Sequence, residues 1–134
     1  MLGDFLLSSA FLLCSTIKNP ELNLLLGRVT NTLCAGEVVQ LTNRNNVDLS
    51  LEQYYQIIHD KTASLISACC EMGAVIGGAT QEQTATLVEF GELVGAAFQI
   101  KDDLLDLLGE REIVGKPTGR DLEKGKITLP IIYM

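Results

Sequence analysis

The sequence predicts an all-α protein. Every segment with a clear hydrophobic period repeats its apolar residues at helical spacing, and none alternates as a half-buried strand does. The connections between the expected helices are short, so neighbouring helices should run antiparallel. The length of 134 residues corresponds to one domain, and 47% hydrophobic with 20% charged residues is typical of a globular chain.

The opening segment is apolar but does not have the pattern of a secretory signal. Asp4 stands where positive charge is expected, and Leu13 stands where a small residue should precede Cys14. Residues 63–80 are too weakly hydrophobic around Glu71 to predict a membrane span. We therefore expect a protein of the cytoplasm or of an organellar matrix.

Three long helices are predicted from their start signals. In the first, an asparagine precedes a proline at the first helical position. In the other two, a serine or threonine is followed three residues later by a glutamine, which is the capping-box spacing. The predicted helices cover residues 20–41, 51–76 and 80–109, and their signals are Asn19-Pro20, Ser50 with Gln53, and Thr80 with Gln83.

After residue 109 the composition changes to glycine, lysine, aspartate and arginine. Glycines and a proline exclude a long helix there, until Thr128 is expected to cap a last helix that begins at Leu129. This segment carries four basic residues, which could form a lid over an anionic ligand. They are Lys116, Arg120, Lys124 and Lys126.

The net charge of -7 and the pI near 4.6 argue against a nucleic-acid partner, which would require basic patches. An anionic ligand would need locally placed lysines or metal ions. The four cysteines form no C-x-x-C pair, so we expect reduced cysteines inside helices. A mean hydropathy of +0.25 is high for so small a chain, which predicts partners, membrane contact or membership of something larger.

An acidic stripe near the end of the third long helix is the first sign of chemistry. At about 100° per residue, Gln99 and three aspartates share an arc of roughly 100°, and leucines lie opposite. A solvated acidic face is one interpretation. The narrowness of the polar strip favours a divalent cation instead, and hard oxygen ligands without histidine or cysteine indicate Mg²⁺ or Mn²⁺ and a phosphorylated ligand. The aspartates are Asp102, Asp103 and Asp106.

Lys61 supports an anionic ligand from another helix. It lies in the middle of the apolar stripe of residues 51–76, where a lysine is costly unless a negative group meets it. Snorkelling to a surface edge is the alternative. Thr62 follows and could donate a hydroxyl to the same site.

Together these motifs resemble a known family, the trans-isoprenyl diphosphate synthases or polyprenyl synthases. The similar elements occur in the order of that family. They are Gly3-Asp4-Phe5-Leu6-Leu7, Lys61-Thr62, Phe98-Gln99, Asp102-Asp103-x-x-Asp106, and Gly115-Lys116-Pro117 through Asp121-Leu122 to Gly125-Lys126-x-Thr128-Leu129-Pro130.

The resemblance implies a helical bundle around a central cavity and a set of site residues. The three aspartates would be the second of two aspartate-rich motifs and would grip an allylic diphosphate through Mg²⁺. Lys61, Lys116 and Lys126 would serve the diphosphate, and Asp121 would add to the metal site. Thr62 and Gln99, with Lys61, would act at the allylic carbons.

The implied reaction is the Mg²⁺-dependent condensation of isopentenyl diphosphate with an allylic diphosphate, which lengthens a trans-prenyl chain. A homodimer or heterodimer through helices, and peripheral membrane contact for long products, are further expectations. In the family a first aspartate-rich motif and the residues that bind isopentenyl diphosphate precede the helix of Gly3 to Leu7. We therefore expect residues 1–134 to be a single partial domain, from the C-terminal portion of the family, that lacks the N-terminal helices with the first motif and also the last C-terminal helices. We expect it to be inactive in isolation.

Two alternatives remain beside an incomplete synthase. One is a non-catalytic partner subunit of a heteromeric synthase, although the intact aspartates with Lys61 and Gln99 favour the catalytic interpretation. The other is an unrelated helical protein that binds magnesium, which would make the motifs from Gly115 to Pro130 accidental.

Overall fold

The structure is a computed structural model that describes residues 1–109 and 118–134. In these residues it contains helices and no strand, which confirms the all-α prediction. The elements are α1 (Leu2–Thr16), α2 (Pro20–Thr42), α3 (Leu51–Ile58), the π-helical turn η1 (His59–Ala63), α4 (Ser64–Ile76), α5 (Gln81–Leu108), α7 (Arg120–Glu123) and α8 (Leu129–Ile132).

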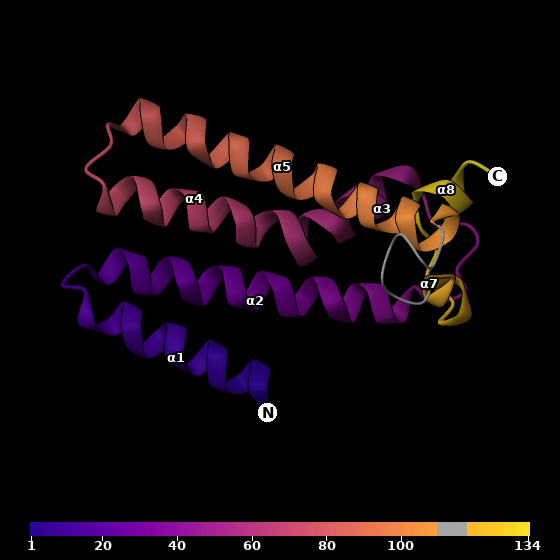
Figure 1. Cartoon of the computed structure of the whole chain (residues 1–134), viewed down its shortest axis with the longest axis horizontal. Coiled ribbons are helices and arrows are strands. Elements are labelled where there is room, and N and C mark those ends of the chain that lie inside the picture. The colour runs from indigo at the N-terminus through magenta and orange to yellow at the C-terminus, as the bar shows by residue number, and fades with distance from the viewer. Residues whose placement is uncertain (110–117) are drawn as a thin grey trace.

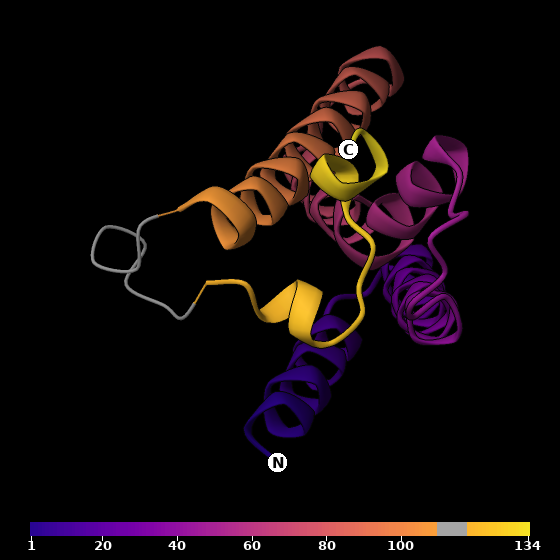
Figure 2. The same ribbon diagram turned by 90° about the vertical axis from the view of Figure 1, so that its right-hand side faces the viewer.

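The four long helices lie side by side in chain order, as Figure 1 shows for α1, α2, α4 and α5. Each runs antiparallel to the one before it, as the short connections predict. Seen along the bundle in Figure 2, α8 lies beside the C-terminal end of α5. The segment after residue 117 therefore returns to the helix that carries the acidic stripe.

The predicted start signals are present as hydrogen bonds. The Asn19 side chain accepts from the backbone N–H of Glu21, and both Ser50 and Thr80 form complete capping boxes. Thr128 stands at the N-cap position of α8 but makes no side-chain cap bond, so that part of the prediction is wrong. It is buried, and its backbone carbonyl accepts from the N–H of Ile131.

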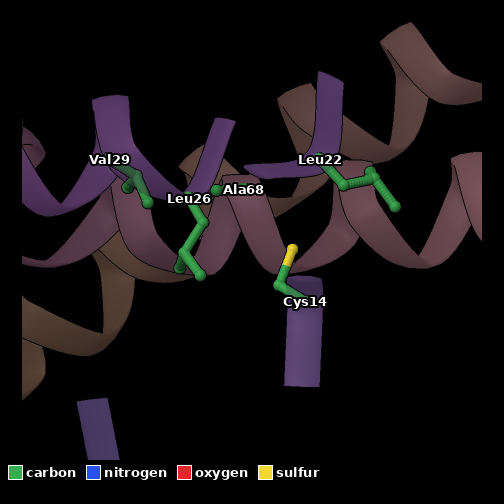
Figure 3. Packing of buried hydrophobic residues seen from close by; sticks show 5 residues of the cluster. All are labelled: Cys14, Leu22, Leu26, Val29 and Ala68. Atoms are coloured by element: carbon green, nitrogen blue, oxygen red, sulfur yellow. The ribbon is translucent and has the colours of Figure 1, made fainter. Parts of the chain in front are cut away.

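The predicted helix over residues 51–76 is interrupted. Residues His59–Ala63 form a π-helical turn between α3 and α4, which adds a residue to the turn and rotates everything that follows. The apolar stripe is therefore divided between two cores. One core lies among α1, α2 and α4 (Figure 3) and the other joins Leu49 to α3. Their buried members are Cys14, Leu22, Leu26, Val29 and Ala68, and Leu49, Tyr54, Ile57 and Ile58.

Glycines allow the helices around η1 to approach closely. A Cβ on Gly95 of α5 would lie 2.5 Å from the Cα of Ala63, and one on Gly91 would lie 2.6 Å from the Cα of Ser67. On the other side, a Cβ on Gly36 of α2 would lie 3.0 Å from the backbone nitrogen of Lys61. Lys61 and Thr62 are thus held between α2 and α5 by backbone contact.

Many large apolar side chains of the long helices are exposed. On α5 these include Phe90, Leu93, Phe98 and Leu108, each at least 58% exposed. None of the described helices is both long and apolar enough to cross a bilayer.

Candidate active site

The candidate site lies along the inner side of the second half of α5. The acidic stripe faces the protein interior there, because Asp103 and Asp106 are 4% and 7% exposed. The leucines lie on the opposite side of α5, as predicted, and this side is exposed to solvent: Leu108 is 73% exposed. The helix is therefore polar inside and apolar outside at this end, which excludes the interpretation of the stripe as a solvated acidic face.

Asp103 accepts hydrogen bonds at both carboxylate oxygens. The Tyr54 hydroxyl donates to its Oδ2 at 2.7 Å, and the Gln99 side-chain amide donates to its Oδ1 at 2.9 Å. Burial raises the pKa of Asp103, and these two hydrogen bonds act in the opposite direction. Within the described residues, the carboxylate is thus held by two neutral donors.

Thr62 extends this chain of hydrogen bonds to η1. Its hydroxyl donates to the Gln99 side-chain carbonyl at 2.8 Å, so Gln99 joins Thr62 to Asp103. The structure therefore joins Thr62 and Gln99, for which the resemblance implies a role at the allylic carbons, to Asp103, for which it implies a role at the metal. The network runs from Tyr54 in α3 through α5 to η1.

Asp106 is tied to the segment that follows residue 117. Its Oδ2 accepts from the backbone N–H of Asp121 at 2.9 Å, and its backbone carbonyl accepts from the N–H of Gly119 at 2.6 Å. Gly119 has a φ of 76°, a left-handed conformation that favours glycine. Asp121 in turn forms an ion pair with Lys126 at 3.0 Å. Asp106, Asp121 and Lys126 thus lie together, and the metal and diphosphate roles predicted for them stay predictions.

Lys61 meets a negative group, as its place in an apolar stripe requires. Its Nζ lies 2.9 Å from a carboxylate oxygen of Glu37 and donates to the Gln40 side-chain carbonyl at 2.6 Å. The hydrogen bond from Lys61 is the largest cause that lowers the pKa of Glu37. Lys61 is held by α2, and the described hydrogen bonds do not join it to the Asp103 network.

Lys116 and Asp102 are the remaining predicted residues of the site. Lys116 lies outside the described residues, so its predicted contact with the diphosphate stays a prediction. Asp102 is partly exposed, unlike the buried Asp103 and Asp106.

The aspartates offer the oxygen ligands that a divalent cation prefers, but among the described residues they are not arranged as a ready-made metal site. Carboxylate oxygens are the ligands that Mg²⁺ prefers, and it usually takes one or two of them with water and substrate phosphates. In residues 1–109 and 118–134 no three histidine, cysteine or acidic side chains form a ready-made metal cluster. Asp103 already accepts from Tyr54 and Gln99, and Asp106 from the backbone N–H of Asp121, so a bound ion would share these carboxylates with the hydrogen bonds that hold them.

Sequence reasoning missed three residues of this region. Nothing in the sequence points to the Tyr54 hydroxyl, although the Tyr54 ring lies in a buried cluster with Leu49. Glu37 and Gln40 have the spacing of one helix face, yet nothing in the sequence pairs that face with Lys61. The pairing depends on how α2 docks against η1.

A model of one protein family, described as polyprenyl synthetase, matches residues 1–134. The chain belongs to this family. It is 38% identical over 131 residues to "Heptaprenyl diphosphate synthase component 2" of Geobacillus stearothermophilus, covering 98% of this chain and 41% of the relative. It is 35% identical over 133 residues to octaprenyl diphosphate synthase of Escherichia coli, covering 99% of this chain and 41% of the relative.

Solved structures agree with this membership of the polyprenyl synthetase family. A polyprenyl synthase from Caulobacter crescentus, complexed with calcium and isoprenyl diphosphate, has a TM-score of 0.92 and 38% identity, over 98% of this chain and 40% of that one. A decaprenyl diphosphate synthase from Rhodobacter capsulatus has a TM-score of 0.87 and 39% identity, over 97% and 40%. The chain thus spans about two fifths of the length of these relatives.

Proposed function

We propose that this chain forms part of a trans-prenyltransferase of isoprenoid biosynthesis, which condenses isopentenyl diphosphate with an allylic diphosphate into a longer prenyl diphosphate. The observation that carries the proposal is the buried polar inner side of α5. There Gln99, Asp103 and Asp106 are joined to η1 and to the segment after residue 117. Burying polar groups costs free energy, so an ordinary helical core does not contain such a polar strip.

The chain's own residues supply the polar half of this chemistry. Lys61 and Lys126 would bind the diphosphate, with Lys116 beside them. Asp102 and Asp106, backed by Asp121, would hold Mg²⁺, or Mn²⁺ in its place. The bound ion would neutralise charge on the departing diphosphate. Gln99 and Thr62 carry oxygen dipoles that can stabilise positive charge on the allylic carbon while the C–O bond breaks.

The reaction is completed by groups outside this set. The double bond of isopentenyl diphosphate attacks the allylic carbon, a C–C bond forms, and loss of a proton gives the longer chain. The printed sequence contains one DDxxD motif. We infer that a second aspartate-rich motif and an isopentenyl diphosphate site must be supplied by other residues or by a partner subunit, and that the 134-residue polypeptide alone does not turn over.

A two-component enzyme is the second candidate. One relative carries the words "component 2" in its name, which supports a heteromeric assembly for this chain as well. The exposed apolar side of α5, with Phe90, Leu93 and Phe98, supports helix-mediated association. Dimer formation, peripheral membrane contact for long products, and residence in the cytoplasm or an organellar matrix remain part of this proposal.

Ligand binding tests the half of the site that is present. In calorimetry with farnesyl diphosphate, we expect binding that depends on Mg²⁺ and that weakens about tenfold or more in Lys61→Ala and Asp106→Ala, because each loses a charged contact. Lys18→Ala and Asp48→Ala change exposed residues away from the site and serve as matched controls. Equal binding by all four variants would contradict the assignment.

A chimera tests turnover. This chain would replace the 133 matched residues of the Escherichia coli octaprenyl diphosphate synthase, to which it is 35% identical. We expect the chimera to lengthen a labelled allylic diphosphate, and the Asp106→Ala chimera to lose that activity. A folded chimera that binds both substrates without making product would argue for the non-catalytic subunit.

A further inference from the structure

Tyr54 lies at one end of the hydrogen-bonded chain and is buried too deeply to contact a substrate itself. It is 2% exposed, and its ring packs in the cluster of Leu49, Ile57 and Ile58. A phenylalanine would satisfy that packing equally well. The hydroxyl therefore needs a separate explanation, and in the described part of the chain it donates to the Asp103 carboxylate at 2.7 Å.

The direction of every hydrogen bond in the chain follows from Asp103. A carboxylate only accepts, so Gln99 must turn its NH₂ toward Asp103, because the opposite orientation would set two oxygens against each other. The Gln99 carbonyl then faces η1, where the Thr62 hydroxyl donates to it at 2.8 Å. The Thr62 hydrogen is used in this bond, so the lone pairs of its oxygen point elsewhere.

We propose that Tyr54 is a positioning residue that, through Asp103, fixes the orientation of the Gln99 and Thr62 oxygens toward developing positive charge. The inference rests on the proposed prenyl transfer. Without the Tyr54 hydroxyl, Asp103 keeps one donor and can rotate about its side-chain bonds. Gln99 is then no longer held in a single orientation, and the oxygen dipoles lose the fixed arrangement on which electrostatic stabilisation depends.

The test uses Tyr54→Phe, with Tyr55→Phe as the matched control. Tyr55 is the next residue, is 44% exposed, and its ring contacts that of Tyr54. The Tyr55→Phe variant therefore also removes one tyrosine hydroxyl from α3 but leaves the Tyr54 hydroxyl in place. Two diphosphates of equal length are compared in the presence of Mg²⁺. One has a neutral alkyl tail. The other carries a protonated tertiary amine at the position of the branched carbon C3, which shares the positive charge of the allylic cation, and so presents the charge of the transition state.

Two readouts separate positioning from mere stability. With ¹⁵N-glutamine labelling, the Gln99 side-chain amide signal is expected to move or broaden in Tyr54→Phe and to stay in Tyr55→Phe. The preference for the ammonium analogue over the neutral one is expected to fall about tenfold in Tyr54→Phe, the size of one charge-assisted hydrogen bond. Affinity for the neutral analogue should stay within about twofold.

The outcomes distinguish this inference from the proposed function. An unchanged Gln99 signal in folded Tyr54→Phe overturns it, and so does a shifted signal with an unchanged preference for the ammonium analogue. If the wild-type chain binds neither diphosphate, the proposed function fails. The Gln99 signal of the ligand-free variants then still decides whether Tyr54 holds the network.

Discussion

The two halves of α5 contact the rest of the protein in different ways. In the first half, Gly91 and Gly95 bring the helix against the backbone of Ser67 and Ala63. In the second half, buried polar side chains make contact beside the apolar Ala96 and Ile100, and Asp103 is the central acceptor. The first half fixes how far α5 lies from η1, and the second half fixes how the polar groups are oriented at that distance. A site that depends on dipole direction needs both.

The largest loss is expected from the polar half. Asp103→Ala leaves the Tyr54 hydroxyl and the Gln99 amide buried without their acceptor. Each unsatisfied donor is costly, although removal of a desolvated carboxylate offsets part of the loss, so we expect a loss of about 3 kcal/mol in urea unfolding. Asp48→Ala, at an exposed position, should change little. A loss below that of the glycine variant described next would reverse the ranking of the two halves.

The glycine half is tested by one substitution at two positions. Gly95→Ala places a Cβ 2.5 Å from the Ala63 Cα, which must shift backbone, and we expect a loss of about 2 kcal/mol. Gly73→Ala in α4 meets no atom within 4 Å, and it should gain about 0.5 kcal/mol, since alanine restricts the unfolded chain and favours the helix. Thermal unfolding of the two variants measures the sign of each change in stability. If both changes had the same sign, close backbone approach would not govern the first half of α5.

The smallest loss of stability is expected at the ion pair of Lys61 with Glu37. This pair tests whether charge pairing adds stability beyond the contacts of the two halves of α5. The Lys61 partner lowers the pKa of Glu37 below its ordinary value of 4.5, so the pair stabilises the fold above that value and the contribution is lost as pH falls through the lowered pKa. Because both side chains are partly exposed, Glu37→Gln should lose about 0.5 kcal/mol at pH 7.

The measurement for this contact is the difference in unfolding free energy between wild type and Glu37→Gln at several pH values. The difference should shrink as pH falls below 4.5, the ordinary pKa of the carboxyl. Asp103 carries a raised pKa and should respond in the opposite direction, gaining relative to Asp103→Asn as acid neutralises the buried charge. A difference that grows in acid would show that Lys61 does not hold Glu37 in solution.

Much of the fold could be predicted because its signals are local. The proline and capping boxes at Asn19, Ser50 and Thr80 each act within a few residues, and α2 and α5 begin where these signals stand. The π turn at residues 59–63 could not be predicted in this way. It changes the helical period on which the side-chain faces were assigned, and it is accommodated by glycines on two other helices, Gly36 and Gly95.

The site, like the fold, was partly predictable from local sequence and partly decided by the packing of helices. The sequence by itself determined that carboxylates and an amide share one side of a helix, that Lys61 needs a negative partner, and that the chain resembles the polyprenyl synthases, because these depend on residue type and spacing. The tertiary structure alone decided that the acidic side of α5 faces inward, that Glu37 is the partner of Lys61, and that Tyr54 donates to Asp103. Those contacts join residues up to 49 positions apart, and only the packing of helices brings them together.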